Sequence, residues 1–154
     1  MRERWLRLGV LAGALFAINV VARLVTRLAF ADDIAAKDRI TIAMMIAVGL
    51  VMAGTAFVWG RLRPQGVVAA DLAAGGGTGG LLSIVVGPLV SGEAPLDDGA
   101  GFFFSQVWLY AGVAGGGALL GLLFLIMLGR DYKSQSLKRF AEAQLAKPKR
   151  PIRR

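Results

Sequence analysis

The chain has 154 residues, of which 56% are hydrophobic and only 18% carry a charge. Soluble domains are about 45–50% apolar and about 25% charged, so the composition indicates an integral membrane protein and not a soluble one. The chain contains no Cys and no His, which excludes disulfides, thiolate nucleophiles and the common zinc and haem ligands. The net charge of +8 is concentrated near the two chain ends, which is typical of a basic cytoplasmic surface on an apolar body.

Four apolar runs follow one another along the chain, at about residues 5–30, 40–59, 66–90 and 103–128. Each has the roughly 20 residues that a helix needs to cross about 30 Å of hydrocarbon. The sequence therefore predicts an all-α integral membrane protein in which residues 1–130 form four transmembrane helices in an antiparallel bundle. Residues 131–154 are expected to form a separate basic cytoplasmic tail.

The charges of the connecting segments predict the orientation of the bundle. Residues 60–65 contain Arg61 and Arg63 and no acid, whereas residues 91–101 contain three acids and no base. Residues 31–39 contain both signs, and both chain ends are basic. Because Lys and Arg gather on the cytoplasmic side of a membrane, we expect both termini and the 60–65 loop in the cytoplasm. The composition, rich in Ala, Gly and Arg, is typical of a bacterial protein, so the membrane is predicted to be the plasma membrane.

A cleaved signal peptide is the rival interpretation of the first run. The sequence Ala-Phe-Ala at residues 29–31 resembles a small-residue cleavage site. A signal peptide has an uninterrupted apolar stretch of about 7–15 residues before that site. Here Asn19, Arg23, Thr26 and Arg27 interrupt the stretch. We therefore expect the first run to remain as a transmembrane helix.

These four interrupting residues form a polar seam on the first helix. Their spacing of i, i+4, i+7 and i+8 puts them on one helix face. In one interpretation, Arg27 and Arg23 extend to the outer headgroups and the acidic outer loops. In the other, Asn19 and Arg23 face the bundle interior, where they line a cavity or contact a partner subunit. The sequence leaves both interpretations open.

Asp71 is the single acid inside an apolar run. It is expected about one helical turn inside the cytoplasmic end of the third span. In a structural interpretation it pairs with Arg7, or contacts Arg61 or Arg63. In a functional one it is a proton or cation site, since carriers commonly use one membrane-embedded carboxylate. Arg23 is expected on the opposite side of the midplane and is not paired with it.

The third span contains the run Gly-Gly-Gly-Thr-Gly-Gly at residues 75–80. Glycine is about 1 kcal/mol worse than alanine in a helix interior, so five glycines weaken the helix locally. Either these small residues let neighbouring helices approach closely, or the helix breaks and its freed backbone groups line a site. In both cases Thr78 is a candidate to satisfy a freed backbone group.

The fourth span carries two small-xxx-small patterns, Gly112 with Gly116 and Gly117 with Gly121. The second span has a similar pattern in Gly49 and Ala53. Such patterns are typical of closely packed membrane helices. We therefore expect these spans to pack tightly with one another or with a second copy of the chain.

The tail is predicted to contain a short amphipathic helix over about residues 131–146. Leu137, Phe140 and Leu145 recur there at helical spacing, with basic residues mainly elsewhere on the helix. Such a helix is expected to lie on the anionic inner leaflet. Residues 147–154 combine two prolines with five basic residues and are predicted to be disordered.

Two functions are compatible with these features. The leading hypothesis is an accessory, scaffold or interaction protein that binds membrane lipids through its tail and a membrane-protein partner or a second copy through its spans. The alternative is a small oligomeric transporter or channel that uses Asp71, Asn19, Arg23 and a broken helix at 75–80. We expect no enzyme activity, because no catalytic residue set is present, and no metal, cofactor or nucleic acid.

Overall fold

The computed structural model describes residues 2–30, 33–92, 94, 96 and 99–146 of the chain. This part of the chain is helical and contains no strand. Its elements are α1 (Arg2–Ala29), α2 (Ile34–Leu62), α3 (Gln65–Leu81), the π-helical turn η1 (Leu82–Val86), α4 (Gly87–Ser91), α5 (Ala100–Met127) and α6 (Tyr132–Ala146). The predicted disordered segment 147–154 lies outside the described residues.

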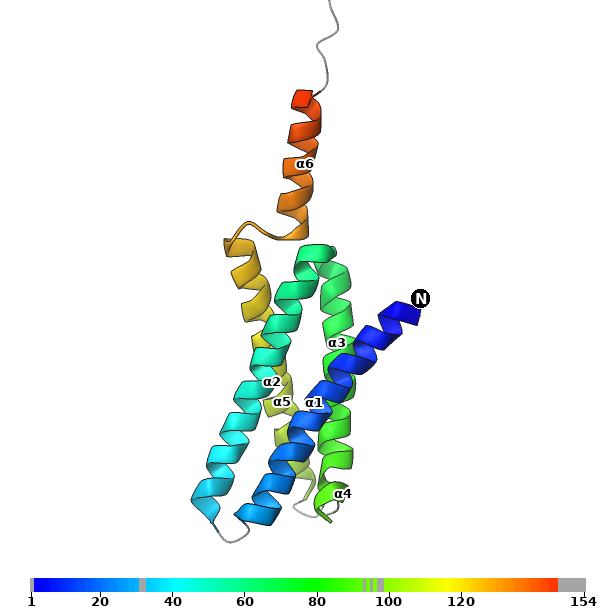
Figure 1. Ribbon diagram of the computed structural model, residues 1–154. Coiled ribbons are helices and arrows are strands. Elements are labelled where there is room, and N and C mark those ends of the chain that lie inside the picture. The colour runs from blue at the N-terminus through cyan, green and yellow to red at the C-terminus, as the bar shows by residue number, and fades with distance from the viewer. Residues whose placement is uncertain (1, 31–32, 93, 95, 97–98, 147–154) are drawn as a thin grey trace, which may run out of the picture.

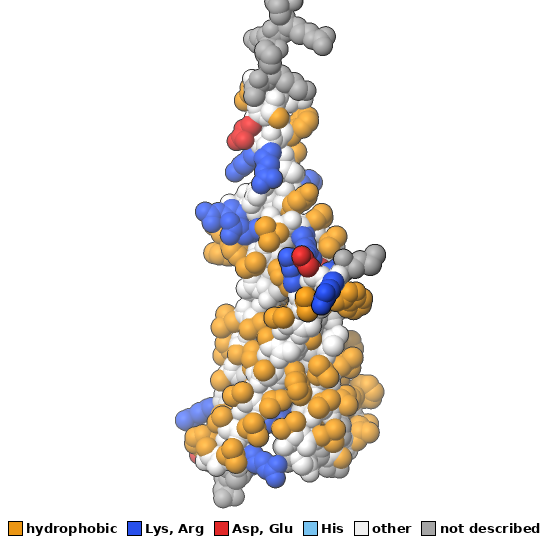
Figure 2. All heavy atoms as spheres, turned by 45° about the vertical axis from the view of Figure 1, so that its right-hand side comes forward, with side chains coloured by type: hydrophobic (Ala, Val, Ile, Leu, Met, Phe, Trp, Pro, Cys, Tyr) orange, Lys and Arg blue, Asp and Glu red, His pale blue; other side chains and the backbone are white. Residues whose placement is uncertain are grey.

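The described residues include four helices that are long and apolar enough to cross a membrane. They are α1, α2, the continuous segment from α3 to the end of α4, and the segment that begins with α5. Apolar side chains cover much of the face of this bundle that Figure 2 shows. Because long apolar helices with exposed apolar side chains are stable in lipid and not in water, these four helices support the membrane protein that the composition predicted.

The ends of α2 follow from local chemistry. Asp33 caps the start, where its Oδ1 accepts a hydrogen bond of 3.0 Å from the backbone N–H of Ala36, which satisfies one of the free amides of the first turn. Helix α2 therefore begins at Ile34 and not at the first residue of the predicted run, Ile40. At the other end Arg63 is extended because it precedes Pro64, whose ring disfavours helical geometry in the preceding residue.

Neighbours in sequence are not the closest neighbours in space. Helix α1 packs mainly on α3, and α2 packs mainly on α5. Figure 1 shows α1 crossing α3 obliquely, and places the N-terminal end of α1, the α2–α3 turn and α6 at the same end of the bundle. The core between these helices is apolar and includes Leu15, Val48, Ala56, Val68 and Leu72.

Helix α6 leaves the bundle after a glycine turn. Gly129 has a φ of +59°, a left-handed conformation that glycine adopts without strain. Helix α6 then extends away from the bundle (Figure 1), and the side chains of Leu137, Phe140 and Leu145 on it are exposed. Asp131 caps this helix, because its Oδ2 accepts a hydrogen bond of 3.2 Å from the backbone N–H of Ser134.

The cap at Asp131 makes the start of α6 sensitive to acid. Hydrogen bonds from Ser134, first from its side chain and then from its backbone, lower the pKa of Asp131 below its ordinary value of 3.8. A lowered folded-state pKa gives stabilisation that is complete above the ordinary pKa and is lost as pH falls through the folded-state value. We expect protection of the first amides of α6 in hydrogen exchange, corrected for intrinsic rates, to persist at the ordinary pKa of Asp131 and to be lost as pH falls through its lowered folded-state pKa.

The Asp131→Ala variant should show weak protection at every pH, since its cap is missing. Asp38→Ala, which removes an exposed carboxylate of α2, is the control and should keep the acid transition of α6. The same transition in the Asp131→Ala variant would contradict the role of this cap.

Candidate functional site

Asp71 lies in a cluster with two arginines where α1 meets α3 and the α2–α3 turn. Its side chain is only 1% exposed. Oδ1 accepts a hydrogen bond of 2.7 Å from Nε of Arg4, and Oδ2 accepts one of 2.8 Å from Nη1 of Arg63. Each carboxylate oxygen therefore has a charged donor, the arrangement that makes burial of a carboxylate tolerable.

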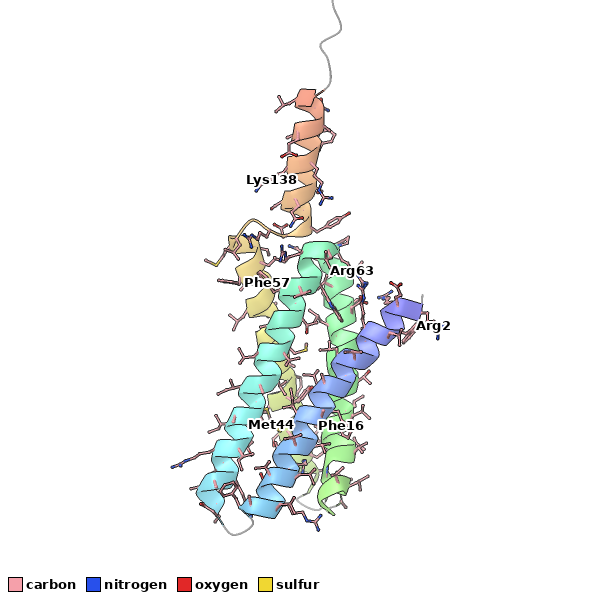
Figure 3. The ribbon with its side chains drawn as sticks, viewed as in Figure 1. Arg2, Phe16, Met44, Phe57, Arg63 and Lys138 are labelled. Carbon is pink, nitrogen blue, oxygen red and sulfur yellow. The ribbon has the colours of Figure 1, made fainter. Side chains whose placement is uncertain are left out.

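This cluster corrects one detail of the sequence prediction. The expected contact of Asp71 with Arg63 is present, but the expected pair with Arg7 is wrong. The second partner is Arg4, and Arg7 instead lies 4.0 Å from Glu3 one turn away on its own helix. Figure 3 labels Arg63 beside the α2–α3 turn, at the end of the bundle to which the start of α1 also belongs.

The glycine run at 75–80 belongs to a continuous α-helix. Helix α3 extends without a break to Leu81, so the broken-helix form expected for a transport site is absent from this run. A Cβ added to Gly75 would lie 2.9 Å from Cδ2 of Leu11, and one added to Gly79 would lie 3.0 Å from Cβ of Leu15. Leu11 and Leu15, four positions apart on α1, thus pack against Gly75 and Gly79, four positions apart on α3. Packing of such i and i+4 rows is a common mode of close helix contact.

The other buried glycines of the run face two different helices. A Cβ on Gly76 would meet the Met52 side chain of α2, and one on Gly80 would lie 2.5 Å from the Tyr110 ring of α5. Thr78 is at an exposed position of α3 and lies on neither packing row. The run is therefore a packing surface against three helices, and its threonine points away from it.

The two glycine patterns of α5 have different surroundings. A Cβ on Gly117 would overlap the backbone carbonyl of Gly49, and one on Gly121 would overlap that of Ala53. These pairs bring the backbones of α5 and α2 into direct contact. In contrast, Gly112 and Gly116 have no atom within 4 Å of a Cβ position, so this second pattern has no partner among the described residues.

The polar seam of α1 lines a cavity of about 720 Å³. The cavity lies between α1, α2, α5 and η1, at the end of the bundle opposite the Asp71 cluster. Arg4 and Arg23 are separated by 19 positions of one helix, or about 28 Å. The lining includes Asn19, Arg23, Thr26 and Arg27 of α1 and Lys37 of α2. The structure thus places the four seam residues in the wall of one cavity, and both interpretations of the seam stay predictions.

Asn19 and Arg23 hold each other in place within this cavity. Nε of Arg23 donates a hydrogen bond of 3.2 Å to Oδ1 of Asn19, and Nδ2 of Asn19 lies 3.4 Å from the Met44 sulfur. A Cβ on Gly87 would lie 2.5 Å from Oδ1 of Asn19 and 3.0 Å from Nε of Arg23. The absence of a side chain at Gly87 thus lets this polar pair lie against the backbone of α4.

Two hydroxyl groups in the cavity wall have no hydrogen-bond partner among the described residues. They are Oγ of Ser83 and the phenol oxygen of Tyr110. Both residues are among those that line the cavity, and they are 1% and 7% exposed. The π-helical turn η1 inserts extra backbone per turn and buries Ser83 at this point. Burial of a hydroxyl without a partner costs about 1–3 kcal/mol.

A second depression lies between α3 and α5. It has a volume of about 540 Å³ and an almost wholly apolar lining of mostly small residues, among them Gly76, Gly77, Ala111 and Gly115. Gly77 and Gly115 have nothing within 4 Å of a Cβ position. This α3–α5 groove is therefore open for a neighbouring helix or acyl chain.

The predicted transport residues do not converge on one pathway. Asn19 and Arg23 line the cavity, Asp71 lies in the ion-pair cluster near the other end, and Thr78 is exposed on α3. Among the described residues, no three Asp or Glu side chains form a group that could hold a metal ion. Sequence reasoning missed Ser83, Tyr110 and Gly87, since each stands in an apolar run with no local signal of its role.

Comparison with known proteins adds no family to this description. No protein-family model, no curated protein and no solved structure matches the chain. The function of this chain is therefore inferred from its own geometry.

Proposed function

We propose that the chain is a non-catalytic scaffold or interaction protein of the bacterial plasma membrane that self-associates through α5. The contact surface is the α5 glycine face, which comprises Gly112, Gly115 and Gly116. The observation that carries the proposal is the open space around these three glycines: none has an atom within 4 Å of a Cβ position.

Unpacked glycines are unfavourable in a membrane helix without a compensating contact. Each costs about 1 kcal/mol relative to alanine in a helix interior. Gly117 and Gly121 on the same helix offset that cost by direct contact with the α2 backbone. The α5 glycine face has no such contact with the described residues of the other helices, and it borders the open α3–α5 groove, where Gly115 and Leu119 form part of the lining.

A second copy of the chain is the occupant that fits this face. Copies inserted in one membrane share one orientation, so their α5 helices run parallel and present Gly112 and Gly116 at the same depth. A two-fold axis along the membrane normal then brings two identical small-residue surfaces together. Parallel helices joined by a small-xxx-small pattern are a common form of membrane helix pair.

We further propose that both termini are cytoplasmic. The N-terminal end of α1, the α2–α3 turn and α6 lie at one end of the bundle (Figure 1), and basic side chains are gathered there (Figure 2). Basic residues near span ends favour the cytoplasmic side. Helix α6 combines exposed Leu137 and Phe140 with Lys138 and Arg139, which supports binding to the anionic inner leaflet.

Transport through Asp71 is the weaker proposal. A proton or cation site needs a carboxylate that can exchange its partner, but both oxygens of Asp71 are held by arginine. The glycine run proposed to break the third span is helical and packed. Scaffold function requires neither a free carboxylate nor a broken helix.

The test of the proposed function is the oligomeric state of the full-length protein in mild detergent. We expect a dimer by native mass spectrometry, and a monomer for the Gly112→Leu/Gly116→Leu variant, because leucine side chains separate the two α5 backbones. The matched control is Gly9→Leu/Gly13→Leu on α1, which has the same spacing and the same open surroundings and should remain dimeric.

Four outcomes would overturn the proposal. The unchanged protein is a monomer at all concentrations, the dimer persists in the α5 variant, or the α1 variant dissociates instead. Co-purification of a different protein that the α5 variant loses would also overturn it, since the face would then belong to another partner.

A further inference from the structure

The cavity lined by the polar seam has the chemistry of an anion site. Three cationic side chains line it, namely Arg23, Arg27 and Lys37, and no described Asp or Glu does. Arg27 and Lys37 form no ion pair with any described residue. Cationic groups in a concave, low-dielectric wall raise the local concentration of anions, and arginine matches the geometry of phosphate oxygens.

The cavity changes in character along its depth. Arg27 and Lys37 lie near the end of the bundle, Arg23 lies one turn further in, and Asn19 lies two turns in, about 12 Å from Arg27 along the helix. Apolar side chains such as Ile40 and Leu109 complete the wall. A ligand that fits this cavity has both an anionic group and an apolar portion.

The two unpartnered hydroxyls also favour an anionic ligand in this cavity. Ser83 and Tyr110 are buried, line this cavity, and lack a hydrogen-bond partner among the described residues. Both can donate to an oxygen acceptor. Because the cavity wall also carries three cationic side chains and no described acid, an anionic oxygen acceptor is the partner that suits both the hydroxyls and the charge of the wall.

The fold also fixes the geometry of the site before any ligand binds. Arg23 is held by its hydrogen bond to Asn19, and both lie against the bare backbone at Gly87. Gly80 likewise lets the Tyr110 ring lie against α3. Preorganised donors lose little freedom on binding, which favours affinity.

We propose that this cavity binds a phosphate group that has no cation on the same headgroup, presented either by an anionic phospholipid or another anionic phosphate-bearing amphiphile of the surrounding leaflet, or by inorganic phosphate. Arg27 and Lys37 attract the group, Arg23 holds it, and Ser83 and Tyr110 donate hydrogen bonds to its oxygens. The site is separate from the α5 glycine face, so its existence does not depend on self-association.

The test uses the full-length protein with an equimolar mixture of phosphatidylglycerol and phosphatidylcholine, followed by native mass spectrometry of retained lipid. We expect selective retention of phosphatidylglycerol. The Arg27→Gln/Lys37→Gln variant should weaken it about 10- to 100-fold, the range for loss of charged hydrogen bonds. The Arg39→Gln/Arg61→Gln variant removes the same charge from exposed positions of α2 outside the cavity, and should leave this selective retention in place.

The Tyr110→Phe variant tests whether the Tyr110 hydroxyl contacts the ligand or only stabilises the fold. If the hydroxyl donates to phosphate, its loss weakens retention of phosphatidylglycerol about 2- to 10-fold without lowering the Tm of the lipid-free protein. A lowered Tm with unchanged retention would overturn the assignment of Tyr110.

Inorganic phosphate in phosphatidylcholine nanodiscs distinguishes the two sources. A rise in Tm with phosphate but not with chloride, abolished in Arg27→Gln/Lys37→Gln, assigns the site to the free anion. Selective retention of phosphatidylglycerol without that response assigns it to lipid. Equal retention of both lipids together with no response to phosphate, or equal loss in the Arg39→Gln/Arg61→Gln control, overturns the proposal.

Discussion

Replacing Asp71 with alanine is expected to lower the free energy of unfolding by about 2–3 kcal/mol. Breaking a buried ion pair costs about 3–5 kcal/mol because the remaining charge is left without its partner. Arg63 and Arg4 are 24% and 54% exposed, so they regain part of their hydration and the loss should fall below that range. Unfolding of the full-length protein in mixed micelles, followed by tryptophan fluorescence, measures the change.

The arginine variants provide the controls for this cluster. Arg4→Gln should cost less than Arg63→Gln, since Arg4 is the more exposed of the two. Removal of both arginines leaves a buried carboxylate without a counter-charge, and adding Asp71→Asn to that variant should restore stability because the charge is then gone. If Asp71→Asn gives no recovery in that background, charge compensation is not what holds α1 on α3.

Replacing Gly121 with alanine should loosen the α2–α5 pair. The added methyl group would overlap the backbone carbonyl of Ala53, and a backbone, unlike a side chain, cannot rotate away. Overpacking of this kind costs about 1–3 kcal/mol, more than the helix propensity that alanine adds. A lower Tm and faster hydrogen exchange in the middle of α2 and α5 are the expected measurements.

Gly54→Ala is the matched control for this contact. Gly54 neighbours Ala53 on α2 but has nothing within 4 Å of its Cβ position. Alanine is about 1 kcal/mol better than glycine in a helix interior, so the Tm should stay the same or rise. Equal destabilisation by both substitutions would mean that α2 requires flexibility at these glycines and not close contact with α5.

The four membrane-crossing helices could be predicted because span length and apolarity are properties of each segment alone. Which of the two glycine patterns of α5 packs against α2 could not be predicted. Gly112 with Gly116 and Gly117 with Gly121 have the same spacing, and only the rotation of α5 against α2 decides which pair contacts Gly49 and Ala53. That rotation depends on all the helices together.

The candidate site residues also divide into those that the sequence could predict and those that it could not. Asn19 and Arg23 could be selected because polar groups are costly in a membrane helix, and Arg63 because it lies on the same side as Asp71. The choice of Arg4 over Arg7 depends on how α1 crosses α3, which no local pattern encodes. Ser83 and Tyr110 were missed because isolated hydroxyls in apolar runs are common, and their importance comes from η1 and Gly80.

The pairing of α1 with α3 and of α2 with α5 has a consequence for synthesis in the cell. When the first two spans have entered the bilayer, neither has met its principal partner, and Arg4 has no Asp71 to bind. The polar seam likewise lacks the wall that η1 and α5 supply. The nascent chain must therefore keep its early spans in the membrane, or beside the insertion machinery, until the last span arrives. Cutting the chain between α2 and α3 separates both pairs, so the two halves form one folding unit.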